Sequence, residues 1–126
     1  MAIHRSNVRE LTSFTKKEIK KTFDSAYRIL KTEGITLLVA PSVQSFGKIL
    51  IITPRKVGSA PVRNKIRRQI KSLFYEEKLY ELGFDWIAII RPAFANNSFD
   101  EIKKLFSTAQ DNLSKHIADQ NESKNS

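Results

Sequence analysis

Five cationic side chains lie within the eleven-residue stretch PVRNKIRRQIK, from Pro61 to Lys71. The cations are Arg63, Lys65, Arg67, Arg68 and Lys71. The first carboxylate after them is Glu76. A helix surface that faces only water usually pairs such cations with carboxylates three or four residues away. An arginine fork, by contrast, can hold a phosphate group through two hydrogen bonds. The stretch therefore predicts a surface that binds a phosphate-rich partner.

Helical periodicity gathers most of these polar side chains on one side. At about 100° per residue, an arc of roughly 140° holds Arg63, Asn64, Arg67, Arg68 and Lys71. Ile66, Ile70 and Leu73 fall on the other side. The spacing predicts a helix that packs on a sheet through its apolar side and presents cations outward. A solvated, salt-bridged helix face is the alternative, but it lacks the acids it needs.

Two further basic groups precede this stretch. Four lysines, Lys16, Lys17, Lys20 and Lys21, stand at i,i+4 spacing, where like charges repel. Arg55 and Lys56 lie in PRKVG, the segment that leads into the basic stretch. Both groups could extend the same polyanion-binding surface, and for the four lysines an ordinary solvated helix face is an equal alternative.

The charge of the whole chain is uneven. The 126 residues carry a formal net charge of +9, and residues 1–80 hold 17 Lys and Arg against 6 Asp and Glu. Residues 81–126 hold 5 against 7. Such asymmetry points to a polyanionic partner, with nucleic acid ahead of a membrane surface. No apolar run approaches the roughly 20 residues that span a bilayer, so no membrane role is expected.

Length and composition indicate one globular domain. Apolar residues make up 40% of the chain, there is no Cys, and the first residues lack the apolar core of a secretory signal. These features predict a soluble, cytoplasmic protein without disulfides. We expect one domain over residues 1–118 and a disordered tail over 119–126. Nothing in the sequence predicts a protein oligomer.

The chain order predicts an α+β fold. TKKE (15–18) and SFDE (98–101) are capping boxes that open helices, and short β-branched or apolar runs predict strands. The expected elements are a helix over 15–31, strands over 35–40 and 48–53, a helix over 59–83, a strand over 86–91 and a helix from 98. Gly34 is expected to end the first helix. This α-β-β-α-β-α order predicts a mixed sheet packed by helices, with a crossover from 53 to 86 between parallel strands.

Catalysis by the chain itself is poorly supported. Its two histidines, His4 and His116, lie near the termini, the second in the expected last turn of a helix. The carboxylates Asp24, Asp85, Asp100 and Glu101 show no metal-ligand or acid–base spacing, so no catalytic residue and no metal site is predicted.

The segment from Arg55 to Lys71, RKVGSAPVRNKIRRQIK, resembles the signature of the bacterial ribonuclease P protein subunit. A basic pair and a Gly precede a small residue, and the pattern R-N-[RK]-x-x-[KR]-R-x-x-[RK] follows. The resemblance extends more loosely over about 11–113. It implies an α-β-β-β-α-β-α sandwich, with a third early strand and a left-handed βαβ crossover that the residue patterns alone do not indicate.

The resemblance also implies a function. In this family the protein does not cleave; it binds a catalytic RNA, and the holoenzyme removes the 5′ leader of precursor tRNA with magnesium that the RNA and substrate use. The basic helix contacts the catalytic RNA, which assigns that role to Arg63, Asn64, Lys65, Arg67, Arg68 and Lys71, with Arg55 and Lys56 beside them. A cleft between the first helix and the sheet receives the leader. Its candidate residues here are Phe23, Ile19, Lys16 and Lys20, with Ile19 at a position where the family often has Phe. The spacing of Phe23 with Ile19 and Tyr27 also fits a plain apolar stripe, so a core position for Phe23 is an equal alternative.

Two other partners fit the same charge pattern. The first alternative is another RNA-binding module, such as a ribosome-associated protein. The second is a DNA-binding helix, which is disfavoured because no helix stands at helix-turn-helix spacing before the basic one.

Overall fold

The protein is described by a computed structural model that covers residues 11–125. Three helices and four strands follow one another along the chain, with short 3-10 helices between some of them. In order they are α1 (Lys16–Ser25), β1 (Tyr27–Lys31), β2 (Ile35–Pro41), β3 (Ile49–Ile52), α2 (Ala60–Glu76), β4 (Phe84–Ile90) and α3 (Phe99–Asn125). The 3-10 helices span Arg55–Val57, Leu79–Glu81 and Pro92–Asn96. The predicted α+β class is confirmed, with the additional strand that the resemblance implied.

The four strands form one mixed sheet in the order β1-β2-β4-β3. β2 pairs antiparallel with both β1 and β4, whereas β3 and β4 are parallel. The connection from β3 to β4 contains α2, so the predicted crossover between parallel strands is confirmed. The left-handed sense of that crossover stays a prediction from the resemblance.

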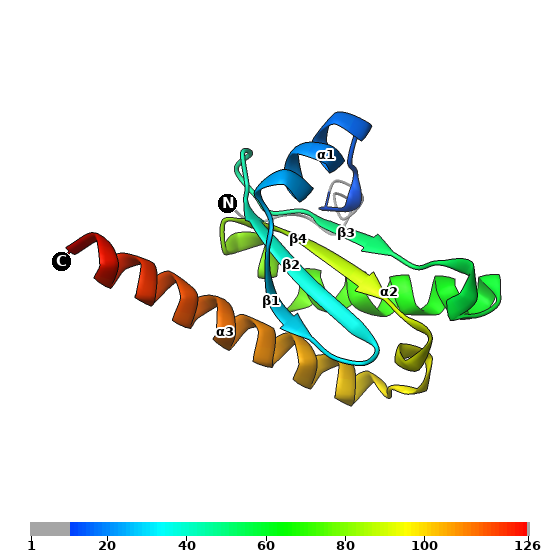
Figure 1. Cartoon of the computed structure of the whole chain (residues 1–126). Coiled ribbons are helices and arrows are strands. Elements are labelled where there is room, and N and C mark those ends of the chain that lie inside the picture. Colours follow the sequence, from blue (N-terminus) through cyan, green and yellow to red (C-terminus); the bar gives the residue numbers. More distant parts are fainter. Residues whose placement is uncertain (1–10, 126) are drawn as a thin grey trace.

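The helices cover opposite faces of this sheet (Figure 1). α2 and α3 pack on the face to which Trp86 points, because the Trp86 ring contacts Phe74 of α2 and Phe106 of α3. α1 lies on the other face, where Thr22 of α1 and Asp85 of β4 line the same small hollow. The result is a three-layer arrangement in which the sheet separates α1 from the two longer helices.

Most of the apolar core lies between the sheet and the two long helices. Trp86 is fully buried, with ring centroids 6.2 Å from Phe74 and 6.0 Å from Phe106. The predicted apolar side of α2 faces this core, since Ile66, Ile70 and Leu73 are all buried. The rotation of α2 is thereby set by the side chains it must bury.

The first helix ends earlier than the sequence predicts. The prediction that this helix continues to residue 31 is wrong, because α1 ends at Ser25 and Tyr27–Lys31 form β1. The Ser25 hydroxyl donates to the carbonyls of Lys21 and Thr22 in the last turn. Pairing with β2 then outweighs the helical spacing that links Ile19 with Tyr27.

Gly34, expected as the end of that helix, lies instead in the turn between β1 and β2. A Cβ atom at this position would approach the backbone N of Phe94 to 2.8 Å. Glycine is required here because another backbone passes close by.

Both long helices also differ from their predicted ends. α2 ends at Glu76, not near Gly83, because Lys78 adopts a left-handed conformation with φ 54° and a 3-10 turn follows. α3 continues to Asn125. The division into one domain over residues 1–118 and a disordered tail over 119–126 stays a prediction. No Gly or Pro interrupts this end of the chain. His116 is therefore not in the last turn, and its ring packs 4.2 Å from that of Tyr27.

Both predicted capping boxes form. The Thr15 hydroxyl accepts from the Glu18 backbone N–H at 3.1 Å. Ser98 and Glu101 cap each other, each side chain accepting from the other's backbone N–H. Ser59 occupies the predicted N-cap position of α2 but makes no side-chain capping bond.

Asp85 is a buried carboxylate at the start of β4. Its Oδ1 accepts 2.8 Å hydrogen bonds from the backbone N–H of Lys48 and from Nε2 of Gln44. Burial raises the pKa of Asp85, and these two hydrogen bonds together with the Lys48 charge oppose that rise only in part, while the Glu18 charge adds to it. The bonded oxygen ties the loop before β3 to β4.

The sign of this shift predicts how pH affects stability. A carboxylate with a raised folded-state pKa binds its proton more tightly in the folded protein than in the unfolded chain. Its contribution to the free energy of unfolding therefore decreases as pH rises above about 3.8. Asp85→Asn keeps an acceptor oxygen but cannot ionise. We expect this variant to gain free energy of unfolding relative to the parent between pH 4 and pH 7, as measured by urea titration.

Asp85→Ala is the matched control. It removes the acceptor and leaves two donors unpaired, so it should cost about 1–3 kcal/mol at both pH values. Equal pH profiles for the parent and Asp85→Asn would contradict the assigned shift.

Candidate nucleic-acid interface

The outer side of α2 carries cations without partner acids. Asn64, Lys65 and Arg68 are exposed, and Arg63, Arg67 and Lys71 are half-buried. Within residues 11–120, none of these cations forms an ion pair with a carboxylate. The sequence showed no acids close to these cations, and the fold brings no described carboxylate into an ion pair with them either. Positive charge on this side is left to meet an external anion.

Arg67 is held in a defined position. Its guanidinium donates to the hydroxyl of Thr53, just after β3, and to Oδ1 of Asn64 one turn earlier on α2. These two bonds use part of the guanidinium and fix its plane. A pre-positioned guanidinium loses less side-chain entropy when it binds a phosphate than a freely rotating one.

A hollow of about 510 Å³ lies beside these side chains. The flank of α2 forms one wall and β3 the other, and the lining residues are Thr12, Ile49, Leu50, Ile51, Asn64, Arg67, Arg68 and Lys71. The structure therefore brings four of the predicted RNA-binding residues together around one concave surface. We call this surface the α2–β3 groove.

The other predicted contacts lie around the groove rather than in its lining. Arg63 donates through Nε to the carbonyl of Gly58 and so braces the start of α2. Arg55 and Lys56 are exposed in the 3-10 helix that precedes α2. Lys65 is exposed on α2 but, at about 100° per residue, points roughly 60° away from Arg68 toward the far flank.

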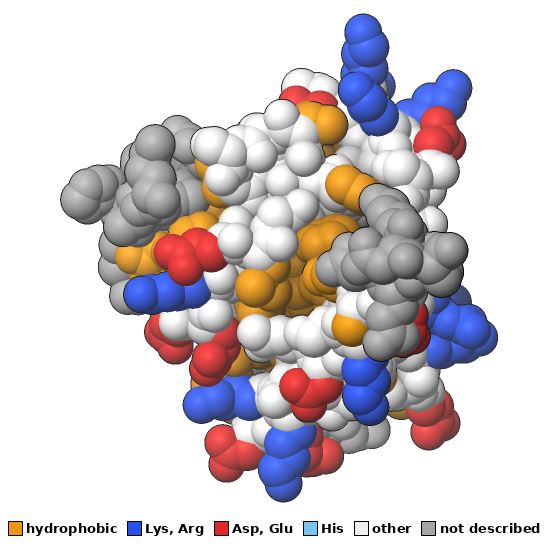
Figure 2. Space-filling view, turned by 90° about the vertical axis from the view of Figure 1, so that its left-hand side faces the viewer, with side chains coloured by type: hydrophobic (Ala, Val, Ile, Leu, Met, Phe, Trp, Pro, Cys, Tyr) orange, Lys and Arg blue, Asp and Glu red, His pale blue; other side chains and the backbone are white. Residues whose placement is uncertain are grey.

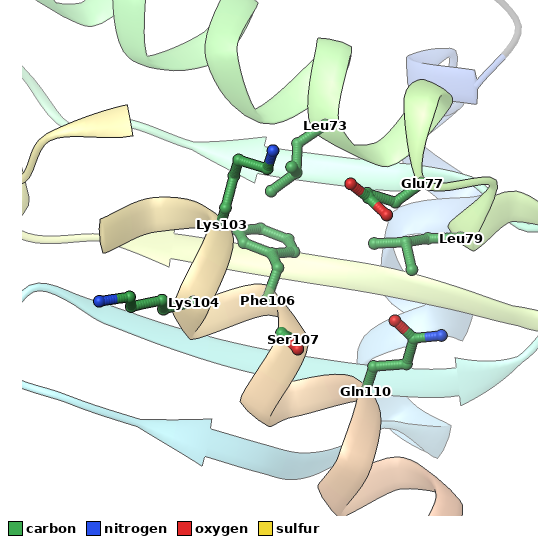
Figure 3. Close-up of a pocket in the computed structure, with 8 residues that line it drawn as sticks. All are labelled: Leu73, Glu77, Leu79, Lys103, Lys104, Phe106, Ser107 and Gln110. Carbon is green, nitrogen blue, oxygen red and sulfur yellow. The ribbon is translucent and has the colours of Figure 1, made fainter. Parts of the chain in front are cut away.

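The opposite flank of α2 has a different character (Figure 3). A hollow of about 270 Å³ separates it from α3, with Leu73, Leu79 and Phe106 at the base. Each of these is at most 2% exposed, so the base offers little surface to a ligand. Glu77 and Lys103 both line this hollow, so its charge is mixed. Among the described residues, the groove beside β3 is lined by no Asp or Glu, in contrast to this hollow.

Charge is also mixed on the side of the molecule shown in Figure 2. Apolar side chains form the base of a hollow there, and Lys and Arg alternate with Asp and Glu around it. The positive net charge therefore does not cover the surface evenly.

The predicted leader-cleft residues all lie on α1. Phe23 is 38% exposed, Ile19 is half-buried, and Lys16 and Lys20 are exposed. The one fully buried side chain described in this helix is Thr22. Phe23 is thus not a core residue, although a plain apolar stripe was the equal alternative in the sequence.

The sheet beneath α1 is only partly covered. Alternation places Leu38, Leu50, Ile52 and Ile89 on the same face as α1, and all four are half-buried. No aromatic side chain stands among them. This face therefore offers aliphatic surface on the same side of the sheet as α1, the helix that carries Phe23, Lys16 and Lys20.

Sequence reasoning missed Lys48. Its Nζ donates to Glu18 Oε2 at 2.9 Å and to the backbone carbonyl of Ser13 at 2.8 Å, and it lies 5.4 Å from the centre of the Phe14 ring. Lys48 lowers the pKa of Glu18, chiefly through this hydrogen bond. A single Lys before a strand carries no pattern, so only the fold could reveal this contact.

Metal and membrane signals are both absent in the described part. Among residues 11–120, no three His, Asp or Glu side chains cluster in a way that could hold a metal ion. No helix described here is long and apolar enough to cross a bilayer.

Known proteins resemble this chain over most of its length. The ribonuclease P family model matches residues 9–114. A ribonuclease P protein component from Mesoplasma florum is 31% identical over 96 residues, covering 71% of this chain and 87% of that protein. One from Petrotoga mobilis is 30% identical over 83 residues, covering 65% and 70%.

Solved structures share the fold. The Staphylococcus aureus RNase P protein matches with a TM-score of 0.70 at 18% identity, covering 80% of this chain and 93% of that one. The Thermotoga maritima RNase P protein matches with a TM-score of 0.64 at 20% identity, covering 75% and 90%. The family match covers the sheet, α1 and the whole α2–β3 groove. The chain therefore belongs to the ribonuclease P protein family.

Proposed function

We propose that this chain binds the catalytic RNA of ribonuclease P through the α2–β3 groove and supports removal of the 5′ leader from precursor tRNA. The observation that carries this proposal is the acid-free groove, in which Asn64, Arg67, Arg68 and Lys71 converge beside β3. Guanidinium forks match phosphate geometry, and a concave surface can follow an RNA backbone. The family relationship supplies the identity of the RNA.

A second surface serves the substrate. The 5′ leader is single-stranded and variable in sequence, so its binding must combine cations that track phosphates with contacts that tolerate any base. α1 and the sheet face on its side offer both, because Phe23, Lys16 and Lys20 are exposed on α1 and the face carries half-buried aliphatic side chains. We assign the leader to this cleft, with Arg55 and Lys56 extending the basic surface.

The chemistry belongs to the RNA in this proposal. The chain supplies no predicted catalytic residue, and magnesium acts with the RNA subunit and the substrate rather than at a protein site. The enzyme is thus the holoenzyme, working in the cytoplasm, where the protein lowers the repulsion between two polyanions.

Arginines in the groove should dominate affinity for the catalytic RNA. Arg67→Ala and Arg68→Ala should each weaken binding by about 1–3 kcal/mol, because each removes a charge-assisted contact. Each should also reduce the salt dependence, with the slope of log K against log salt falling by roughly 0.7–0.9 per lost phosphate contact. A filter-binding titration with the ribonuclease P RNA measures both.

Lys115→Ala on α3 is the matched control, since Lys115 is an exposed cation outside the groove. Folding should survive in Arg68→Ala, because the buried apolar side of α2 is untouched. Unchanged affinity of both arginine variants at moderate salt would remove the groove from the interface.

Phe23 should contribute to leader binding rather than to stability. Phe23→Ala should weaken binding of precursor tRNA by the holoenzyme by about 1 kcal/mol, the low end for a lost base contact, while mature tRNA binding stays nearly constant. The melting temperature should change little because Phe23 lies outside the hydrophobic core and is 38% exposed. A lower melting temperature with an unchanged precursor-to-mature ratio would show a packing role only.

The protein should act on the ionic requirement of the RNA. We expect the protein to cleave no precursor tRNA by itself and to lower the magnesium concentration that the RNA needs for half-maximal cleavage, because protein cations replace part of the counterion atmosphere. Cleavage assays across a magnesium series, with and without protein, test this. Cleavage by protein that survives exhaustive nuclease treatment would refute the division of labour.

A further inference from the structure

α1 has little apolar packing to hold it on the sheet. Of its ten residues only Thr22 is buried, while Ile19 is half-buried and Phe23 is 38% exposed, and none of the three belongs to the main hydrophobic core. A narrow hollow of about 60 Å³, lined by Thr22 and Ser25 on one side and Val43 on the other, separates part of α1 from the loop after β2. Apolar burial therefore fixes the position of this helix less firmly than it fixes α2 and α3, which bury several apolar side chains completely.

Polar contacts of the Lys48 side chain also hold the start of this helix. The Lys48 ammonium bonds to Glu18 in the first turn of α1 and to the carbonyl of Ser13 just before it, and it lies over the Phe14 ring. The Lys48 side chain is only 15% exposed. A charge-assisted bond that is largely shielded from water holds geometry better than an exposed ion pair does.

Lys48 is itself fixed to the centre of the sheet. Its backbone N–H donates to Asp85 Oδ1 at 2.8 Å, and its carbonyl accepts from the Trp86 N–H at 2.7 Å. Both partners belong to β4. One residue thus connects the start of α1 to the strand that carries the main core.

We propose that Lys48 is a positioning residue for substrate recognition: it sets the place of α1, and through α1 the place of Phe23 and Ile19 beside the sheet. This inference rests on the proposed leader cleft. Lys48 does not contact the leader in this account, because its ammonium is already occupied by two oxygen atoms and one ring. Its loss should therefore act on the leader only through α1.

Four variants of the reconstituted holoenzyme separate the possible roles. Lys48→Met removes the ammonium and keeps the aliphatic stem, Lys48→Arg restores the charge, and Glu18→Gln removes the partner charge. Lys115→Met is a matched loss of one cation elsewhere. The measurements are the ratio of precursor to mature tRNA affinity, the affinity for the catalytic RNA, and amide hydrogen exchange over α1.

A positioning role gives a specific pattern. Lys48→Met should lower the precursor-to-mature ratio by roughly two- to twentyfold, the range for residues that act on a site without touching its ligand. Its affinity for the catalytic RNA should not change, and amide exchange over α1 should become faster. Lys48→Arg should restore both the precursor-to-mature ratio and the exchange rate. Glu18→Gln should shift the ratio in the same direction, by less, since the bond to Ser13 remains.

Direct contact with the leader would give the opposite result for Glu18→Gln. Releasing the ammonium from its carboxylate would then leave the ratio unchanged or raise it, and that outcome overturns the positioning role. A ratio in Lys48→Met equal to that in Lys115→Met overturns it as well.

These measurements distinguish a wrong assignment of the leader cleft from a wrong positioning role for Lys48. If the parent holoenzyme binds precursor and mature tRNA equally, the leader cleft is wrong, and the exchange measurement decides the fate of Lys48. Faster exchange over α1 in Lys48→Met, reversed in Lys48→Arg, supports the positioning role. Unchanged exchange overturns it.

Discussion

The contact of Trp86 with Phe74 and Phe106 is the packing interaction on which the arrangement depends. It joins the central strand β4 to both long helices and is fully buried. Because α2 must turn Phe74 and its row of aliphatic side chains toward this ring, the helix cannot rotate. Its cations are consequently placed beside β3, where they form the α2–β3 groove. The α2–β3 groove is thus a consequence of core packing, and any change that rotates α2 would disperse it.

The two faces of the sheet are stabilised by different physics. α2 and α3 bury apolar side chains, which gives them a fixed place and leaves the groove rigid. α1 has one buried side chain, and Lys48 joins its first turn to β4 through hydrogen bonds and one ion pair. A surface for one structured RNA benefits from rigidity, whereas a cleft for leaders of variable sequence benefits from exposed, tolerant contacts. The proposed function uses one surface of each kind.

Local patterns predicted much of this architecture. The capping boxes at Thr15 and Ser98, the apolar side of α2 and the parallel crossover all follow from short-range rules that the fold obeys. The strand at 27–31 could not be predicted, because its residues continue the helical spacing and only pairing with β2 decides their state. In the site, the cationic stretch was visible as a charge pattern. The bonds of Arg67 to Thr53 and of Lys48 to Glu18 join distant segments and leave no periodic trace.

The central claim is that the α2–β3 groove binds the catalytic RNA of ribonuclease P. The most direct measurement is identification of the RNA that is covalently captured in cells by a photoreactive side chain placed at Asn64, an exposed position on the rim of the groove. The account predicts that ribonuclease P RNA is the enriched species, and that a probe at Lys115 on α3 captures far less of it. Enrichment of ribosomal RNA instead, or equal capture from both positions, would contradict it.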